Sequence, residues 1–270
     1  MMQPQALVTG ETRFIGLVGD PVAHIRSPEF YNPRLVRLGA NVLLIPIHVP
    51  DELFDATIPG LQKMGNLAGL IFTAPFKERA ARFADEILPS GVQVGAINAM
   101  RPDKERRWTA DIFDGIGLVR ALEAMEAPPA GKRALLLGAG GAGRAIALAL
   151  ARAGINALTL FDRNPGKMAR LAGDIARFYP ACAVATPAAV AADGHDIIIN
   201  ATPVGMSPGD GLPTPLGPLD PACVVFDIVP KPDVTPLMAY AAEAGCRVGG
   251  GRLMIDGQAD AVLEFLGFAA

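Results

Sequence analysis

A glycine-rich segment in the middle of the chain constrains the fold more than any other part of the sequence. Residues 134–145 read ALLLGAGGAGRA, so a short apolar run leads into Gly138, Gly140 and Gly143 in the spacing G-x-G-x-x-G. In a strand–turn–helix unit the first glycine permits a tight turn, the second lets the backbone approach a pyrophosphate, and the third allows close helix–strand packing. A glycine turn of purely structural origin is the alternative. We predict a dinucleotide-binding turn that consists of Gly138, Ala139, Gly140, Gly141, Ala142 and Gly143, with helix N–H groups facing the anion.

An acidic residue indicates which dinucleotide this turn prefers. Asp162 stands 24 positions after Gly138, at the expected end of the next strand. A carboxylate there accepts hydrogen bonds from the adenosine ribose hydroxyls and repels a 2′-phosphate. Arg163 and Lys167 are the cations that a 2′-phosphate would need, although both are equally explained as solvated surface charges. We therefore expect NAD as the cofactor, with NADP as the alternative.

Short apolar runs alternate with segments of helical period on both sides of the turn. This pattern predicts an α/β fold with mostly parallel sheets, and 270 residues have room for about two domains. A proline- and glycine-rich break at residues 128–131 places the boundary between residues 114 and 131. The expected strands are 14–18, 42–49, 69–72, 96–100, 134–137, 157–161, 196–200 and 224–229. The expected helices are 28–38, 52–64, 78–84, 116–126, 143–153, 167–178, 237–244 and 256–266, with an exposed hairpin or loop at 101–108.

Composition and charge exclude several other classes of protein. With 24 Lys+Arg against 27 Asp+Glu, a net charge of −3 leaves no basic surplus to neutralise a nucleic-acid backbone. Apolar stretches such as residues 145–151 are far shorter than the ~20 residues that span a bilayer, and residues 1–12 lack the pattern of a secretory signal. The cysteines (182, 223, 246) and histidines (24, 48, 195) are scattered, without the spacing of a disulfide framework or a metal site. We expect a cytoplasmic monomer or homodimer that acts on a small molecule, with no metal, nucleic acid or membrane as partner.

Further motifs follow one another along the chain. They are GDPVAHIRSP at 19–28, TAPFKE at 73–78, GAIN at 95–98, DIFDG at 111–115, NATPVGM at 200–206 and DIVP at 227–230, with Met254 and Gln258 near the C-terminus. In identity and order they resemble the shikimate dehydrogenase family over nearly the whole chain, and TAPFKE is similar to that family's T-x-P-x-K signature.

The resemblance implies an N-terminal α/β substrate domain that faces a Rossmann domain across a cleft. The expected bounds are 1–114 plus 247–270 for the substrate-binding catalytic domain and 115–246 for the NAD(P)-binding domain. The implied reaction is hydride transfer between a nicotinamide cofactor and a ring hydroxy or oxo acid related to shikimate or quinate, as in aromatic amino acid biosynthesis.

Two residues match the catalytic pair of the family. Lys77 matches its catalytic lysine and Asp114 its aspartate partner. A lysine held near a carboxylate can take the hydroxyl proton as hydride leaves. Without the resemblance, Lys77 is explained as a surface lysine at a helix start and Asp114 as a helix N-cap. The implied substrate contacts are Ser27, Thr73, Asn98 and Gln258, and the implied cofactor contacts include Asp162, Arg163, Thr202, Val204 and Ile228.

The expected substrate pocket departs from the family pattern. Ile25 stands at the first position of the S-x-S pair that binds the substrate carboxylate, Ile71 replaces a substrate-binding Asn, and Ile112-Phe113 replaces the usual Asn-Thr. A lost hydrogen bond is worth roughly 0.5–1.5 kcal/mol, so three losses predict much weaker shikimate binding and a less polar or differently substituted substrate. Compensating donors are possible at Tyr31, Arg26 or His24. Ser27 before Pro28 is also typical of a helix N-cap.

Several other functions are compatible with parts of the pattern. They are oxidation of quinate or an amino-substituted ring alcohol, a dehydrogenase for an unrelated small alcohol, the methylenetetrahydrofolate dehydrogenase architecture, and a non-catalytic NAD-binding sensor or regulatory protein. The Thr73-x-Pro75-x-Lys77 spacing and the Asp114 motif favour the shikimate type. Retention of both Lys77 and Asp114 speaks against a sensor.

Overall fold

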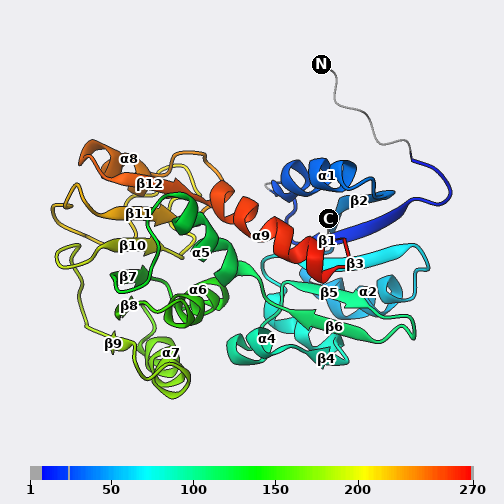
Figure 1. The fold of residues 1–270 in the computed structure, drawn as a ribbon, viewed down its shortest axis with the longest axis horizontal. Helices are drawn as coiled ribbons and strands as arrows, with labels where there is room; N and C mark the ends of the chain where they lie inside the picture. The colour runs from blue at the N-terminus through cyan, green and yellow to red at the C-terminus, as the bar shows by residue number, and fades with distance from the viewer. Residues whose placement is uncertain (1–7, 24, 269–270) are drawn as a thin grey trace. The chain divides into compact units, whose positions relative to one another are not determined.

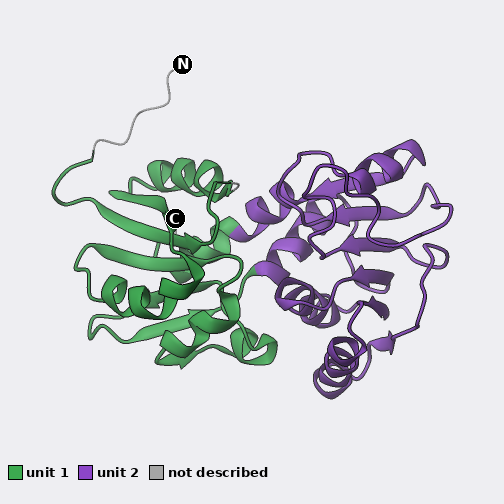
Figure 2. Cartoon of the chain, turned by 180° about the vertical axis from the view of Figure 1, so that it is seen from behind, with its two compact units in different colours: residues 1–113, 259–270 green, residues 114–258 purple. Residues whose placement is uncertain are grey.

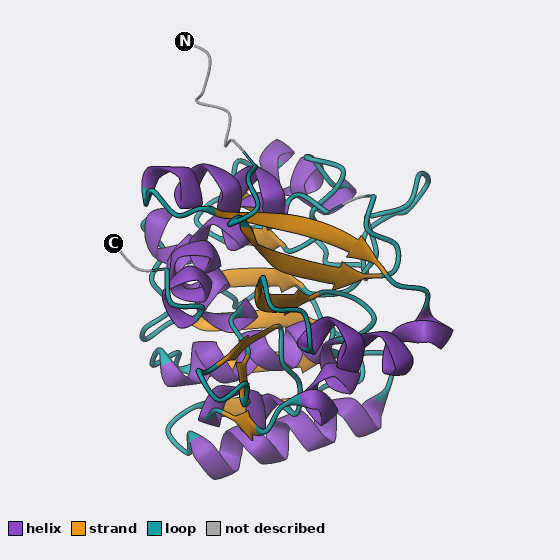
Figure 3. Cartoon of the chain, turned by 90° about the vertical axis from the view of Figure 1, so that its right-hand side faces the viewer, coloured by secondary structure: helices purple, strands orange, loops and turns teal. Residues whose placement is uncertain are grey.

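The chain folds into two compact units, which the computed structural model describes over residues 8–23 and 25–268. Unit 1 is formed by residues 1–113 with 259–270, and unit 2 by residues 114–258 (Figure 2). In the described part of the chain each unit has one six-stranded sheet, and helices alternate with the strands (Figures 1 and 3). The predicted two-domain α/β fold is confirmed.

The sheet of unit 1 is mixed, with strand order β2-β1-β3-β5-β6-β4. Strands β2, β1 and β3 run parallel, whereas β5 is antiparallel to both β3 and β6. The expected hairpin at 101–108 accounts for the antiparallel pairing of β5 with β6, because strands joined by a short turn pair antiparallel. The elements are β1 (Arg13–Gly19), α1 (Ser27–Arg37), β2 (Val42–His48), η1 (Asp51–Leu53), α2 (Phe54–Gln62), β3 (Leu67–Phe72), α3 (Lys77–Ala80), η2 (Ala81–Phe83), β4 (Glu86–Ile87), α4 (Pro89–Val94), β5 (Ala99–Pro102) and β6 (Trp108–Asp111).

An aromatic cluster forms part of the core of unit 1. The rings of Phe54 and Phe76 stack with their centroids 4.0 Å apart, and Phe72 meets Phe54 edge-on at 6.1 Å. All three side chains are buried. Phe76 belongs to the TAPFKE motif, so burial of its ring anchors the segment between β3 and α3 in the core.

The sheet of unit 2 is parallel throughout, with strand order β12-β11-β10-β7-β8-β9. The chain starts in the middle at β7, continues outward to β8 and β9, and then returns to the other side of β7 for β10, β11 and β12. This is the Rossmann arrangement, in which ligands bind beyond the carboxyl ends of the strands where the order reverses, here between β7 and β10. The elements are α5 (Asp114–Ala124), β7 (Arg133–Leu137), α6 (Gly141–Arg152), β8 (Ala157–Phe161), α7 (Pro165–Phe178), β9 (Ala183–Ala185), β10 (Ile197–Asn200), β11 (Val224–Asp227), α8 (Pro236–Glu243), β12 (Arg247–Gly250) and α9 (Gly251–Phe265).

The chain returns to unit 1 later than the sequence indicates. We expected the return at residue 247, but Arg247 pairs with Val224 in the parallel sheet of unit 2, and the division falls between Gln258 and Ala259, inside α9. The cause is β12, whose sequence RVGG has the appearance of a turn. At the earlier boundary, where the chain passes from unit 1 to unit 2, unit 1 ends at Phe113. We expected it to end at Asp114, which instead belongs to unit 2.

Other elements differ from the predicted pattern in small ways. The expected strand at 96–100 begins only at Ala99, and the short elements β4, α4 and β9 were not predicted, since two to six residues carry too little periodicity. Among the helices of the described residues, none combines the length and hydropathy that a bilayer crossing would need.

Candidate functional site

One edge of the unit 1 sheet gathers the residues of three motifs. The N–H of Thr73 donates to the carbonyl of Val18 at the end of β1 (3.0 Å), and the N–H of Phe72 donates to the carbonyl of Asn98 (2.8 Å). The N–H of Asn98 donates in turn to the carbonyl of Asp111 at the end of β6 (3.0 Å). Since β5 is antiparallel to β3 and β6, its start lies beside their ends. Thr73 and Asn98 therefore lie on one edge of this sheet.

Lys77 is the first residue of α3 and follows this edge directly. Its carbonyl accepts the N–H of Ile97 (2.9 Å), and the carbonyl of Ala74 accepts the N–H of Asp20 (3.2 Å). The segment from Thr73 to Lys77 is thus held between β1 and the residues that precede β5. Lys77 is half-buried.

Asn98 fixes the backbone in front of Asp114. Its Oδ1 accepts the N–H of Phe113 (2.9 Å), and only 4% of Asn98 is exposed. Asp114 opens α5 and is itself buried. Asn98, expected as a substrate contact, therefore holds the peptide that precedes Asp114. No local sequence pattern indicates this contact, because 15 residues separate Asn98 and Phe113.

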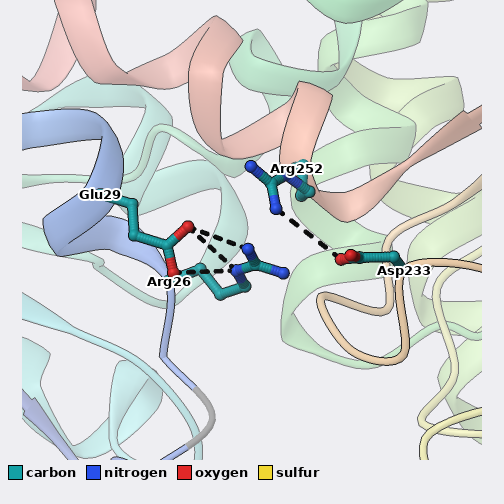
Figure 4. A network of polar contacts seen from close by, with 4 residues as sticks. All are labelled: Arg26, Glu29, Asp233 and Arg252. Atoms are coloured by element: carbon teal, nitrogen blue, oxygen red, sulfur yellow. Dashed lines mark hydrogen bonds and ion pairs between the residues drawn. The ribbon is translucent and has the colours of Figure 1, made fainter.

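Ser27 is not the N-cap of α1. The cap position belongs to Arg26, and Ser27 already lies within the first helical turn, from which its hydroxyl cannot act as the cap. The Arg26 guanidinium binds Glu29, with Nη2 to Oε2 at 2.9 Å and Nε to Oε1 at 3.1 Å (Figure 4). Of the donors expected to compensate for lost pocket contacts, Arg26 thus has a carboxylate partner, Tyr31 is buried, and His24 lies outside the described residues.

Two of the apolar departures from the family pattern are buried in unit 1, and a third packs on an aromatic ring. Ile71 is 7% and Ile112 6% exposed. The ring of Phe113 packs on Phe265 with their centroids 5.2 Å apart. Ile71 lies two residues before Thr73, so both side chains leave the chain on the same face. An apolar side chain thus stands on the face of unit 1 that carries the Thr73 side chain.

The glycine turn of unit 2 combines tight packing at its first and third glycines with open space at Gly140 and Gly141. A Cβ on Gly143 would lie 2.0 Å from the carbonyl oxygen of Gly138, and a Cβ on Gly138, whose φ is +100°, would lie 2.9 Å from the backbone of Ala201. At Gly140 no atom beyond the two neighbouring residues lies within 4 Å of where a Cβ would be. These are the surroundings that a dinucleotide turn requires, since the first and third glycines pack and the second leaves room for a pyrophosphate.

Asp162 is anchored beside this turn. Its Oδ2 accepts the N–H of Ala139 (2.8 Å) and its Oδ1 accepts the N–H of Asn164 (2.8 Å). Asn164 also caps α7 by accepting the N–H of Lys167 (3.2 Å). The carboxylate is therefore fixed at the end of β8, while the side chains of Arg163 and Lys167 are exposed.

A buried polar network fixes the segment after β10. The Nδ2 of Asn200 donates to Asp227 Oδ1 and to the carbonyl of Val204, each at 3.0 Å, and the Oδ1 of Asn200 accepts the N–H (3.0 Å) and the hydroxyl (2.7 Å) of Thr202. Asp227 Oδ2 accepts the hydroxyl of Thr235 at 2.7 Å. Asn200 and Asp227 are fully buried, and this burial raises the pKa of Asp227. The network holds Thr202 and Val204, two of the expected cofactor contacts.

Sequence reasoning did not identify this network as such. The signal was present, because Asn200 and Asp227 each end a strand of three apolar residues, and a polar residue there must find a partner at the sheet edge. Ile228, the third expected contact of this edge, donates its N–H to the carbonyl of Asn200 at 3.0 Å.

The other expected residues lie away from these contacts. Gln258 is the last residue of unit 2 and lies on α9. Its Cβ is 2.9 Å from where a Cβ on Gly117 of α5 would lie.

Within the described residues there is no group of His, Cys, Asp and Glu side chains suited to hold a metal ion. The three cysteines are buried, and burial raises the pKa of Cys223 to about 12.

Comparisons with known proteins agree over both units. Residues 17–100 match the shikimate dehydrogenase substrate binding domain, and residues 133–209 match the coenzyme F420-dependent NADP oxidoreductases. A shikimate dehydrogenase (NADP(+)) of Rubrobacter xylanophilus is 35% identical over 255 residues, which cover 92% of this chain and 88% of that protein.

Solved structures are similar over nearly the whole chain. A shikimate dehydrogenase in complex with NADP⁺ has a TM-score of 0.88 at 28% identity and covers 97% of this chain and 92% of its own. The shikimate 5-dehydrogenase of Listeria monocytogenes, in complex with shikimate and NAD, has a TM-score of 0.84 at 28% identity, covering 99% and 94%. The ligand-free 5-ketofructose reductase of a Gluconobacter strain has a TM-score of 0.83 at 27% identity, covering 94% and 92%.

Proposed function

Because this chain belongs to the shikimate dehydrogenase family, we propose that it transfers hydride between a nicotinamide cofactor and a ring hydroxy or oxo acid related to shikimate or quinate. One observation carries the proposal: unit 1 retains the lysine motif at the end of β3, and unit 2 has a glycine turn open at Gly140 beside the reversal in strand order. The names of the relatives support this class of reaction.

The residues of each unit have separate tasks in this proposal. The glycine turn, with Thr202, Val204 and Ile228, would hold the cofactor, which when bound supplies or accepts the hydride. Lys77 would take the hydroxyl proton during oxidation and return it during reduction. Asp114 would orient the lysine for this proton transfer. Ser27, Thr73, Asn98 and Gln258 would contact the substrate.

Substitution of the catalytic pair tests the proposal. Lys77→Ala and Asp114→Asn are each expected to lower kcat by about 10²- to 10⁴-fold, the usual contribution of general acid–base catalysis, while NAD binding persists. Lys63→Ala, which changes an exposed lysine, serves as the control. Turnover unchanged in both variants would remove these residues from their roles. Cofactor binding without turnover of any ring alcohol would instead favour a non-catalytic NAD-binding protein.

We also propose that NAD is preferred over NADP. The fixed carboxylate of Asp162 supports this, because it suits ribose hydroxyls and repels a 2′-phosphate. Thermal unfolding with each cofactor at equal concentration measures the preference, since a ligand stabilises by RT ln(1 + [L]/Kd). NAD is expected to raise the unfolding temperature more than NADP does. Asp162→Asn is expected to reduce this difference between the cofactors, and the exposed control Asp193→Asn to leave it unchanged. An equal or larger shift with NADP would contradict the proposal.

A second candidate is a substrate that lacks a carboxylate. Ile25 at the carboxylate-binding position favours it, and one similar structure is named a 5-ketofructose reductase. The test compares shikimate, quinate and 5-ketofructose. Ile25→Ser is expected to raise kcat/KM for shikimate by about tenfold, the value of one restored hydrogen bond. A wild-type kcat/KM for shikimate of about 10⁴ M⁻¹s⁻¹ or more would rule out an altered specificity.

A further inference from the structure

The segment after β10 consists of two successive turns that a single side chain connects. The first turn closes through the N–H of Met206 and the carbonyl of Pro203 (3.2 Å), and the second through the N–H of Asp210 and the carbonyl of Ser207 (3.1 Å). The Oδ2 of Asp210 then accepts the N–H of Gly205 (2.8 Å) and the N–H of Ser207 (2.9 Å). One carboxylate oxygen therefore ties the end of the segment back to its middle.

The two halves of the segment depend on different anchors. Asn200, backed by the buried Asp227, holds the first half through Thr202 and Val204. The second half begins at Gly205, whose φ of +105° turns the chain away. Asp210 is the side chain that binds the N–H groups of this second half, so the buried network does not replace it.

We propose that Asp210 is a positioning residue that holds residues 204–207 in the conformation required for cofactor binding. The inference rests on the proposed function, in which Thr202 and Val204 contact the cofactor. Loss of the two hydrogen bonds would leave Gly205 free to sample other conformations, and cofactor binding would then have to order the segment again.

The charge of Asp210 suits this task. Its carboxylate accepts backbone N–H groups, that of Ser207 first, and these lower its pKa below the ordinary value of 3.8. A lowered folded-state pKa means that the interaction is present above the ordinary pKa and is lost only as the pH falls through the lowered value. Asp210 is therefore ionised, and the turns are tied, at the pH of any ordinary assay.

Three variants of the full chain test the proposal. Asp210→Ala removes the acceptor and is expected to weaken NADH binding, measured by fluorescence titration, by about tenfold. Asp210→Asn is expected to stay within about threefold of wild type, because both N–H groups share one oxygen that an amide can replace. Asp220→Ala is the matched control: Asp220 accepts the N–H of Ala222 (2.9 Å), but it precedes β11 and so lies at the opposite edge of the sheet.

Hydrogen exchange without cofactor separates positioning from general stability. Asp210→Ala is expected to accelerate exchange in residues 203–210 by about tenfold or more while β10 and β11 keep their protection. Unchanged exchange or unchanged NADH affinity in Asp210→Ala would overturn the inference, as would an equal loss of affinity in Asp220→Ala. If the wild type bound no nicotinamide cofactor, the proposed function itself would fail, so the two failures are distinguishable.

Discussion

Two glycines in neighbouring helices of unit 2, Gly143 of α6 and Gly173 of α7, differ in how much room a side chain would have. At Gly143 a Cβ would collide with the carbonyl oxygen of Gly138 at 2.0 Å, and backbone atoms cannot move aside as a flexible side chain can. At Gly173, an exposed glycine inside α7, no atom other than those of its chain neighbours and its own helix backbone lies within 4 Å of the same position. The two positions therefore form a matched pair for substitution by alanine.

We expect Gly143→Ala to destabilise the protein by about 1–3 kcal/mol, as overpacking does, and to weaken NAD binding because the turn must shift. Gly173→Ala is expected to stabilise by up to about 1 kcal/mol through helix propensity. Urea unfolding monitored by circular dichroism measures both changes. A neutral Gly143→Ala would show that the turn tolerates a side chain and that the third glycine is not required.

Asp227 makes stability depend on pH in an unusual direction for a carboxylate. Burial raises its folded-state pKa above the ordinary 3.8, so the folded chain holds the proton more tightly than the unfolded chain. The contribution to stability is complete below the ordinary pKa and is lost as the pH rises through the folded-state pKa.

Asp227→Asn removes this titration. The unfolding free energy of the wild type, minus that of Asp227→Asn, is expected to decrease as the pH rises from about 4 to 8. Thermal unfolding at a series of pH values measures the difference, with Asp193→Asn at an exposed site as the control substitution. A difference that stayed constant over the range would mean that Asp227 does not titrate there.

At the scale of elements, the first part of α9 belongs to unit 2, whereas its last part and the residues that follow it belong to unit 1. Leu266 follows α9, is buried in unit 1, and has its Cδ2 2.6 Å from where a Cβ on Gly69 of β3 would lie. Leu253, in the part of α9 that belongs to unit 2, is 41% exposed. The glycine in β3 thus leaves space that Leu266 fills.

Leu266→Ala is expected to destabilise the protein by about 2–5 kcal/mol, the range for a leucine truncated in a core. Leu253→Ala is expected to cost much less than Leu266→Ala, because 41% of Leu253 stays exposed to water in the folded chain. Urea unfolding distinguishes the two. Equal effects of the two substitutions would contradict the assigned burial of Leu266.

Which elements the sequence predicts depends on where their determinants lie. Helix α7 has its start signal in adjacent residues, Asn164 as N-cap and Pro165 in the first turn, and pattern reasoning finds it. Strand β12 has no such signal in adjacent residues. Its Gly249 leaves room for distant side chains, because the ring of Phe226 and the sulfur of Met125 lie 2.5–2.6 Å from where a Cβ on Gly249 would be. In the sequence that glycine indicates a turn, and only the distant partners show that it belongs to a strand.

At the scale of the whole molecule, the proposed function assigns the cofactor contacts to unit 2 and all substrate contacts except Gln258 to unit 1. NAD should therefore protect unit 2 from hydrogen exchange at residues 138–143 and 200–206, and a bound ring acid should protect unit 1 at residues 73–77. Exchange measured by mass spectrometry with each ligand alone tests the assignment, and β4, at the far end of the unit 1 sheet, is expected to serve as an unaffected reference. NAD-dependent protection confined to residues 73–77 would contradict it.

Part of the candidate site in unit 2 was predictable from the spacing of residues, whereas the catalytic roles at Lys77 and Asp114 were predicted only from the family resemblance. The glycine turn and Asp162 were found from spacing alone, and the structure places them in contact through the N–H of Ala139. The roles of Lys77 and Asp114 came from family resemblance and stay predictions. The expected N-cap at Ser27 was wrong by one residue, because cap propensity does not determine which residue closes the first turn.

The sequence by itself determined the α/β class, the order of the two units and the nucleotide-type turn, because these depend on periodicity and spacing among neighbouring residues. Tertiary structure decided the return to unit 1 inside α9, the support that Asn98 gives to Phe113, and the joining of Asn200 to Asp227. Each of these links residues far apart in the chain, so it depends on strand order and register. Hydrogen bonds between the ends of neighbouring strands form only after the strands have paired. The local sequence pattern does not determine which strands become neighbours.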